Sequence, residues 1–171
     1  MPSKDTDITT AKETATVEGG ESYQSQRVPL DSNDGTVTID FATFEQILEM
    51  DDDEDHEFSR TIVWGFMDQA TETFQSMSDY LKKKDLKELS SLGHFLKGSS
   101  ATLGLTKVKD YCEKIQNLGL SRDETGVGRI EDPEVSLAGI KSALDEMKKE
   151  YTRVRDYFIG YYDNPNGNHQ P

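Results

Sequence analysis

Cysteine is nearly absent from this sequence, since Cys112 is the one thiol among 171 residues. A single cysteine excludes an intramolecular disulfide framework and a cysteine-based zinc site. Long apolar runs are also missing, and no segment approaches the roughly 20 apolar residues that span a bilayer. The N-terminal stretch MPSKDTDITTAKETATVEGG lacks the apolar core of a secretory signal. We therefore expect a soluble intracellular protein of a reducing compartment.

Basic residues are in deficit as well. The chain has 19 Lys and Arg against 33 Asp and Glu, a formal net charge of -14. Such a chain is repelled by nucleic-acid phosphates and by anionic membrane surfaces, so we expect neither as a partner. A Gly-rich nucleotide-binding loop is missing too. We therefore expect no autonomous kinase activity, since the chain has no means of taking phosphate from ATP.

Composition divides the chain into three parts. Residues 1–36 are rich in Ser, Thr, Glu, Asp and Gly and carry few large apolar side chains. Such a segment buries too little surface to offset the entropy lost on ordering. The last residues, DNPNGNHQP, consist largely of turn formers. We predict a disordered tail over residues 1–36, a folded domain over 37–162 and a flexible tail over 163–171.

The folded part has helical periodicity throughout. We predict a short helix capped near Thr38 or Asp40, a long second helix that starts within the acidic run 51–55, and helices over 85–103 and 106–118 separated by Gly104. A loop over 119–133 precedes a last helix. Its apolar positions alternate spacings of three and four: Leu137, Ile140, Leu144, Met147, Tyr151, Val154 and Phe158.

That regular spacing is compatible with a coiled-coil seam. Because the chain has other amphipathic helices of its own, we favour one face of a bundle. The fold class expected is all-α, an antiparallel up-down four-helix bundle with an additional short N-terminal helix.

The segment SSLGHFLKGSS, residues 90–100, is the most informative for chemistry. At about 100° per residue the stripe opposite His94 faces the core, so His94 faces solvent. That stripe comprises Leu89, Leu92, Leu96, Ser99 and Leu103. The side of the helix that carries His94 holds Lys97 and the small residues Ser90, Ser91, Gly98 and Ala101.

These residue types suit a phosphoryl carrier. A solvent-exposed imidazole is a nucleophile near neutral pH. Lys97, three residues on, reaches a group attached to the ring and stabilises its negative charge. Gly98 costs about 1 kcal/mol in mid-helix relative to alanine, and the open space it leaves explains its presence. The pattern predicts a nucleophile whose electrophile is delivered by another protein.

The string from His94 to Ser100 resembles the signature of histidine-containing phosphotransfer (HPt) domains, H-x-x-K-G-(S/A)-(S/A). The similarity continues through residues 101–105 and 112–119, where it resembles fungal phosphorelay intermediates of osmotic stress signalling. The resemblance covers about residues 38–162. It implies a multistep His-Asp phosphorelay, in which the chain accepts a phosphoryl group from the receiver domain of a hybrid sensor histidine kinase and passes it to response-regulator receivers.

The resemblance also implies residue roles. His94 would be phosphorylated, Lys97 would contact the phosphoryl group, and Gly98 would keep the approach clear. Gln116 would hydrogen-bond the His94 ring. No cofactor is expected on this chain, because the receiver would supply Mg²⁺. We further expect a monomer that resides in cytoplasm and nucleus. Some relatives carry a basic residue where this chain has Leu120.

The first helix would form part of the receiver-docking surface, with an apolar patch and an acidic rim. The patch comprises Ile47, Leu48 and Met50, and the rim comprises Asp51, Asp52 and Asp53. Between residues 82 and 116 eight lysines stand against four acids, which suits the acidic active site of a receiver.

Two other functions fit parts of the sequence. The first is a scaffold that binds partners through the first helix, with His94 incidental. The second is a metal-binding protein built on residues 51–56, although that run lacks the spacing of a calcium loop. Cys112 lies on the apolar face of its helix and is interpreted as core packing.

Overall fold

The computed structural model describes residues 37–52 and 55–163. Within those ranges the chain forms five helices: α1 (Phe41–Leu48), α2 (Glu57–Lys83), α3 (Leu86–Thr102), α4 (Thr106–Gly119) and α5 (Pro133–Asp163). The one sheet-like contact there is an isolated antiparallel bridge between Arg122 and Arg129. Helix α5 extends to Asp163, one residue into the predicted C-terminal tail. The rest of both predicted tails lies outside the described residues.

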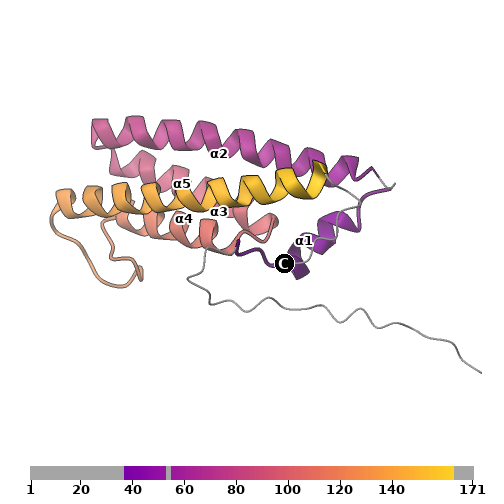
Figure 1. The fold of residues 1–171 in the computed structure, drawn as a ribbon. Helices are drawn as coiled ribbons and strands as arrows, with labels where there is room; N and C mark the ends of the chain where they lie inside the picture. The colour runs from indigo at the N-terminus through magenta and orange to yellow at the C-terminus, as the bar shows by residue number, and fades with distance from the viewer. Residues whose placement is uncertain (1–36, 53–54, 164–171) are drawn as a thin grey trace, which may run out of the picture.

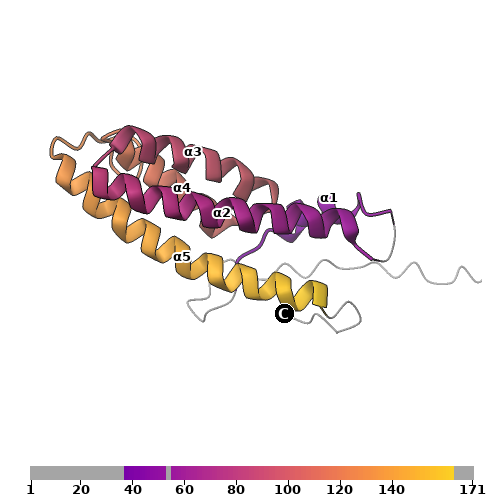
Figure 2. The ribbon, with the colours of Figure 1, turned by 90° about the horizontal axis from the view of Figure 1, so that it is seen from above.

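The helices α2 to α5 form a bundle, and α1 lies beside one end of it (Figures 1 and 2). Two residues connect α2 to α3 and three connect α3 to α4, so consecutive helices run in opposite directions. Helix α5 runs back along α4 and α2 and closes the bundle. The predicted up-down four-helix bundle with a short N-terminal helix is confirmed. Among the described helices, none is long and apolar enough to cross a membrane.

Two residues that are recognisable in the sequence mark the start of α1 and the end of α3. The Asp40 carboxylate accepts a hydrogen bond from the Ala42 N–H at 3.2 Å and so caps α1. Gly104 has φ +70° and ends α3, a conformation that favours glycine. The Asp40 N–H donates to the Gly104 carbonyl oxygen at 2.7 Å, which fastens α1 to the α3–α4 turn. Both predictions, the Asp40 cap and the Gly104 break, are confirmed.

The core lies between the helices and takes apolar side chains from all five. The apolar stripe of α2 is buried from Val63 to Met77, and Leu81 is partly buried. The stripe of α5 is also buried apart from Tyr151, and it packs against α2 and α4, so it is a bundle face rather than a coiled-coil seam. Cys112 is fully buried, and burial raises the pKa of its thiol to about 12. That environment confirms the interpretation of Cys112 as core packing.

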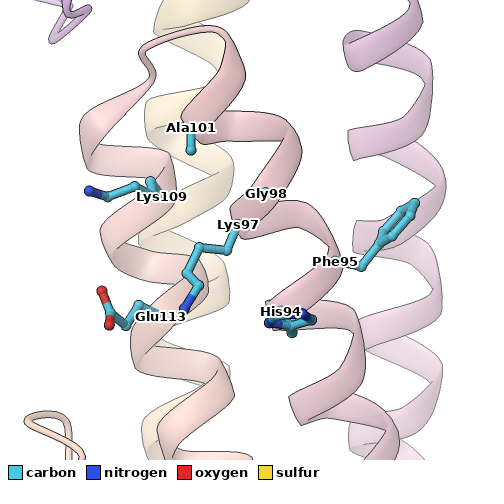
Figure 3. Close-up of a pocket in the computed structure, with 7 residues that line it drawn as sticks. All are labelled: His94, Phe95, Lys97, Gly98, Ala101, Lys109 and Glu113. Atoms are coloured by element: carbon cyan, nitrogen blue, oxygen red, sulfur yellow. The ribbon is translucent and has the colours of Figure 1, made fainter.

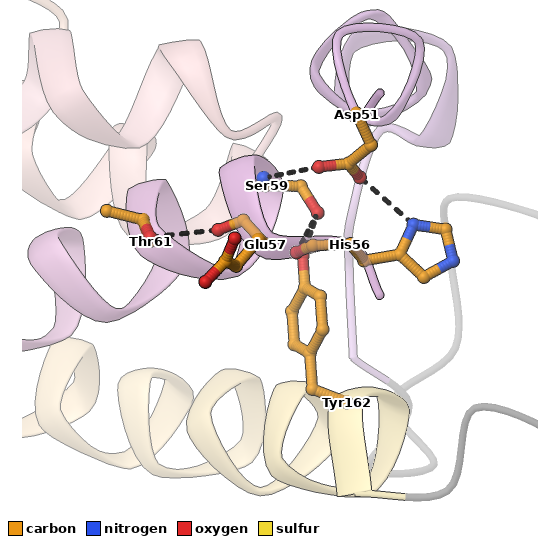
Figure 4. A network of polar contacts seen from close by, with 6 residues as sticks. All are labelled: Asp51, His56, Glu57, Ser59, Thr61 and Tyr162. Atoms are coloured by element: carbon orange, nitrogen blue, oxygen red, sulfur yellow. Dashed lines mark hydrogen bonds and ion pairs between the residues drawn. The ribbon is translucent and has the colours of Figure 1, made fainter. Parts of the chain in front are cut away.

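The start of α2 differs from the prediction. The helix begins at Glu57, after the acidic run rather than within it. Asp51 nevertheless stabilises this helix end from outside, because its carboxylate accepts the Ser59 N–H at 2.8 Å and lies 3.0 Å from His56 Nδ1 (Figure 4). Tyr162 of α5 donates to Ser59 Oγ at 2.9 Å. The network thus joins the α1–α2 connection to the end of α5.

Asp51 is consequently a structural residue. Its side chain is 2% exposed. Burial alone would raise the pKa of this carboxyl, but hydrogen bonds from Ser59 and His56 outweigh burial and hold the pKa below its usual value. A carboxylate engaged in this way is not available to a partner, so its assignment to the docking rim is wrong.

Candidate functional site

His94 lies near the middle of α3, and its side chain is exposed, as predicted. It borders a shallow depression of about 540 Å³ between α3 and α4 (Figure 3). The α3 side of this depression is lined by His94, Phe95, Lys97, Gly98 and Ala101. The α4 side is lined by Lys109 and Glu113.

The buried face of α3 explains why His94 points outward. Leu89 and Leu96 are 0% exposed, and Leu103 just beyond the helix is 1% exposed. Because these positions recur at helical spacing, the residue opposite them must face solvent. One part of the prediction is wrong: Ser90 is buried rather than beside His94 on the open face. Its hydroxyl donates to the Gln116 carbonyl oxygen at 3.0 Å, so Ser90 belongs to the α3–α4 contact.

Gln116 of α4 reaches the ring of His94. Its Nε2 lies 3.4 Å from His94 Nδ1, the contact that the resemblance implies. The other amide atom, Gln116 Oε1, is buried and has no hydrogen-bond partner among the residues that the structure describes. The Nδ1 edge of the imidazole is therefore covered by α4. The Nε2 edge makes no hydrogen bond within the same described part of the chain.

Lys97 and Gly98 complete the predicted constellation. In Figure 3 the Lys97 side chain extends from α3 across the depression toward α4. A Cβ atom added at Gly98 would have no atom within 4 Å, so open space adjoins this position. The structure therefore brings His94, Lys97, Gly98 and Gln116 together. A nucleophilic nitrogen, a cation and an unobstructed approach are the elements that transfer of a group from another protein requires.

Three residues of the depression were not predicted. Lys109 and Glu113 face it from α4 and lie seven and three residues before Gln116, so helical spacing from Gln116 was a usable signal. Phe95 is 52% exposed although it is large and apolar. The available sign was its position outside the leucine stripe, about 100° around the helix from His94.

The predicted docking residues differ in their exposure. Met50 is 60% exposed and Asp52 is exposed, whereas Leu48 is partly buried. Ile47 is 8% exposed and packs in the core, so its assignment to an apolar surface patch is wrong. The reason is that α1 has only eight residues and needs Ile47 to hold it against the bundle. Asp53 lies outside the described residues.

A metal centre has little support in this arrangement. Among the described residues there is no group of three or more His, Cys, Asp or Glu side chains placed to hold an ion. Asp51 of the acidic run and His56 just after the run bond to each other, and Asp51 also accepts the Ser59 N–H of α2. These contacts account for both residues without an ion.

Comparison with known proteins gives a consistent result. The family model described as "Hpt domain" matches residues 61–156. Multistep phosphorelay regulator 1 of Schizosaccharomyces pombe is 48% identical over 125 residues, which is 73% of this chain and 42% of that protein. Phosphorelay intermediate protein YPD1 of Candida albicans is 53% identical over 81 residues, 47% of this chain and 44% of that protein. The matched segments thus span less than half the length of these curated relatives.

Solved structures share the fold. The crystal structure of the yeast phosphorelay protein YPD1 superposes with a TM-score of 0.64 at 32% identity, covering 74% of this chain and 95% of that one. The co-crystal structure of the Saccharomyces cerevisiae histidine phosphotransfer signaling protein Ypd1 with the receiver domain of its downstream response regulator Ssk1 gives a TM-score of 0.65 at 35% identity. That match covers 75% of this chain and 98% of the other.

Proposed function

Because the chain belongs to the Hpt domain family, we propose that it carries a phosphoryl group on His94 in a multistep phosphorelay. It accepts the group from the receiver domain of a hybrid sensor histidine kinase and passes it to response-regulator receivers. The observation that carries the proposal is an exposed imidazole whose Nδ1 edge is held by Gln116 and whose neighbouring Gly98 leaves open space. The relative crystallised with a receiver domain supports the choice of partner.

The transfer step conserves the phosphoryl group. His94 Nε2 attacks the phosphorus of the receiver's aspartyl phosphate, the N–P bond forms as the aspartyl O–P bond breaks, and the receiver carboxylate leaves. The second transfer is the same step in reverse, with a different receiver as acceptor. A loose transition state asks little of the protein except positioning and charge stabilisation. The receiver supplies Mg²⁺, and this chain supplies the nucleophile without any kinase activity of its own.

Gln116 selects the nitrogen that reacts. Neutral imidazole is nucleophilic at the nitrogen that lacks a hydrogen, so Nε2 attacks only when Nδ1 carries the hydrogen. Nδ1–H then needs an acceptor, and a half-turn of the Gln116 amide presents Oε1 to it. The buried Oε1 at present lacks a donor among the described residues, so the half-turn also satisfies that atom. In that orientation the amide holds the ring in the reactive tautomer.

Lys97 and the residues that line the depression stabilise the negative charge of the phosphoryl group. The lysine extends over the space beside His94, where its ammonium stabilises the negative oxygens of the phosphoryl group. Lys109 adds a second positive charge on the α4 side, where Glu113 also borders the depression. The net positive charge of these three side chains favours an incoming phosphate.

The docking surface proposed for the receiver consists of exposed apolar side chains on three elements. They are Met50 of the α1–α2 connection, Phe58 and Ile62 of α2, and Phe95 of α3, which are 60%, 41%, 36% and 52% exposed. Large apolar side chains exposed on a protein surface are characteristic of protein contacts. Phe95 follows His94 directly and extends from α3 toward α2 in Figure 3, so contact there brings the partner beside the nucleophile.

A transfer assay tests the proposal. The chain is mixed with a receiver domain phosphorylated on its aspartate and with Mg²⁺, and acid-labile, base-stable label on the chain is measured. We expect label on the wild type and none on His94→Gln, with helix content and receiver binding unchanged. His169→Gln is the matched control, because it makes the same chemical change outside the described domain and should remain labelled. Receivers that bind while label never reaches the chain would overturn the proposal in favour of the scaffold function.

A further inference from the structure

Helices α3 and α4 touch backbone to backbone beside the proposed site. A Cβ atom added at Gly93 would lie 2.9 Å from the Cys112 carbonyl oxygen, 2.9 Å from the Gln116 nitrogen and 3.3 Å from the Gln116 Cα. Real Cβ atoms essentially never approach other atoms within 3.0 Å. The neighbours are backbone atoms inside a helix, so they cannot swing aside as a flexible side chain would. Only glycine fits at position 93 with α4 at this distance.

We propose that Gly93, together with Ser90, is a positioning residue that brings Gln116 within reach of the His94 ring. Gly93 permits the close approach, and the Ser90 hydroxyl fastens it by donating to the Gln116 carbonyl oxygen at 3.0 Å. Both residues therefore touch the backbone of the residue whose side chain holds Nδ1. The effect on transfer rate rests on the proposed phosphotransfer function, whereas the effect on the ring does not.

The distances show why the approach must be this close. Gln116 Nε2 lies 3.4 Å from His94 Nδ1, which is already at the long end of the hydrogen-bond range. Ordinary contact for a Cβ begins at 3.4 Å, so alanine at position 93 moves the Gln116 backbone outward by about 0.5 Å. The side-chain contact then exceeds the range in which a hydrogen bond forms. A single methyl group on the face of α3 that packs against α4 thus breaks the hydrogen bond between Gln116 and the exposed His94 ring.

Gly93 and Gly98 consequently have opposite tasks. Gly98 borders open space, where its lack of a side chain matters to the approaching partner. Gly93 is buried against α4, where its lack of a side chain matters to a residue of the same chain. Gly93 also directly precedes His94, so any strain there acts on the turn of helix that carries the nucleophile.

The first test reads the ring itself. Ring ¹⁵N chemical shifts of His94 report which nitrogen carries the hydrogen, and they are measured in the full chain without any partner. We expect Gly93→Ala to shift the tautomer fractions to those of Gln116→Ala. The matched control is Gly139→Ala, whose Cβ also meets an atom at 2.9 Å, Leu118 Cδ1 on the α5 side of α4. That variant adds the same methyl group at a glycine packed against a side chain of α4 rather than against its backbone, and it should leave the His94 signals as in the wild type.

The second test is a double-mutant cycle on the transfer rate. Loss of one hydrogen bond predicts that Gly93→Ala slows transfer about two- to tenfold. If Gly93 acts through Gln116, the same substitution in the Gln116→Ala background adds no further slowing. Slowing of equal size in both backgrounds would overturn the positioning role and leave only a packing role.

Ser90→Ala keeps the inference testable if Gly93→Ala fails to fold. It adds no bulk and removes only the bond to the Gln116 carbonyl oxygen, so we expect a fold intact by circular dichroism and ring signals shifted in the same direction as in Gln116→Ala. Unchanged ring signals in Ser90→Ala would overturn the inference. Failure of the wild type to accept label would overturn the proposed function instead, and the ring measurement would still decide the role of Gly93.

Discussion

Substitution of Gly98 should change the stability of the protein and its phosphotransfer rate in opposite directions. The residue lies inside α3, is exposed, and has no atom within 4 Å of the position that a Cβ would occupy. The folded chain therefore accommodates a side chain there without steric cost. If the glycine serves the partner's approach, replacing it should stabilise this protein and impair transfer at the same time.

The gain in stability follows from helix propensity. Alanine in a helix interior is favoured over glycine by about 1 kcal/mol, and no steric term opposes that gain at this position. For a domain of this size the gain corresponds to a rise of about 3–5 °C in the melting temperature. Gly98→Gln gains somewhat less, because glutamine has a slightly lower helix propensity than alanine.

The loss of transfer follows from distance. A side chain at position 98 stands one helical turn from His94 on the exposed side of α3 and meets the receiver before the phosphorus reaches Nε2. A misplacement of 1 Å between reacting groups costs about a hundredfold in rate. We expect about that loss for Gly98→Gln, and a smaller loss for Gly98→Ala, whose single methyl group displaces the receiver less.

The experiment combines a thermal melt followed by circular dichroism with the transfer assay on the same preparations. Gly160→Ala of α5 is the matched control, because its Cβ also meets no atom within 4 Å and lies in a helix away from the proposed site. It should keep the wild-type transfer rate. Wild-type transfer by Gly98→Gln would refute the role assigned to Gly98, and a lower melting temperature for Gly98→Ala would refute the open space inferred beside it.

Two further substitutions test charge. Lys97→Ala should slow transfer about tenfold or more by removing a charge-assisted contact with the phosphoryl group. Lys87 is an exposed lysine on the same helix, and Lys87→Ala should leave the transfer rate unchanged. Equal slowing by both substitutions would indicate that only the overall charge of the helix matters. Asp51→Ala should lower the free energy of unfolding at pH 7 by about 1 kcal/mol, because the Ser59 N–H at the start of α2 loses its acceptor. Because the pKa of Asp51 is held below its usual value, its stabilisation is full above about pH 4 and is lost as the pH falls through the folded-state pKa. Urea unfolding should therefore show the gap between wild type and variant narrowing in acid, and a constant gap would contradict the assignment.

Much of the site was predictable because strong local signals mark it. The leucines of α3 recur at helical spacing, so the exposure of His94 follows from the sequence. Asp40 and Gly104 are the residue types that cap and end helices, and both do so here. The nearness of Gln116 was implied by the resemblance to HPt domains, and the tight turn at Gly104 agrees with it, because two antiparallel helices bring residues at similar distances from the turn together.

The residues that were predicted wrongly or missed all depend on how separate elements pack against one another, which local sequence patterns do not show. Ser90 and Gly93 carry no hydrophobic signal, so periodicity does not show that they face α4, and only the packed pair of helices does. Ile47 is apolar on a short amphipathic helix, which suits either a core or a docking patch. An aspartate stabilises a helix N-terminus from inside or from just outside the helix, so the sequence does not decide between the two positions. The structure shows that Asp51 acts from outside α2.

Local chemistry in this chain thus determines the helices, their caps and the outward direction of His94, because each depends on residues within a turn or two of one another. The separation of α3 from α4 depends on residues far apart in sequence, and only the tertiary structure decides it. That separation controls whether Gln116 reaches His94. It is set where Gly93 meets the backbone of Gln116, since two helices can approach this closely only where no side chain stands between them.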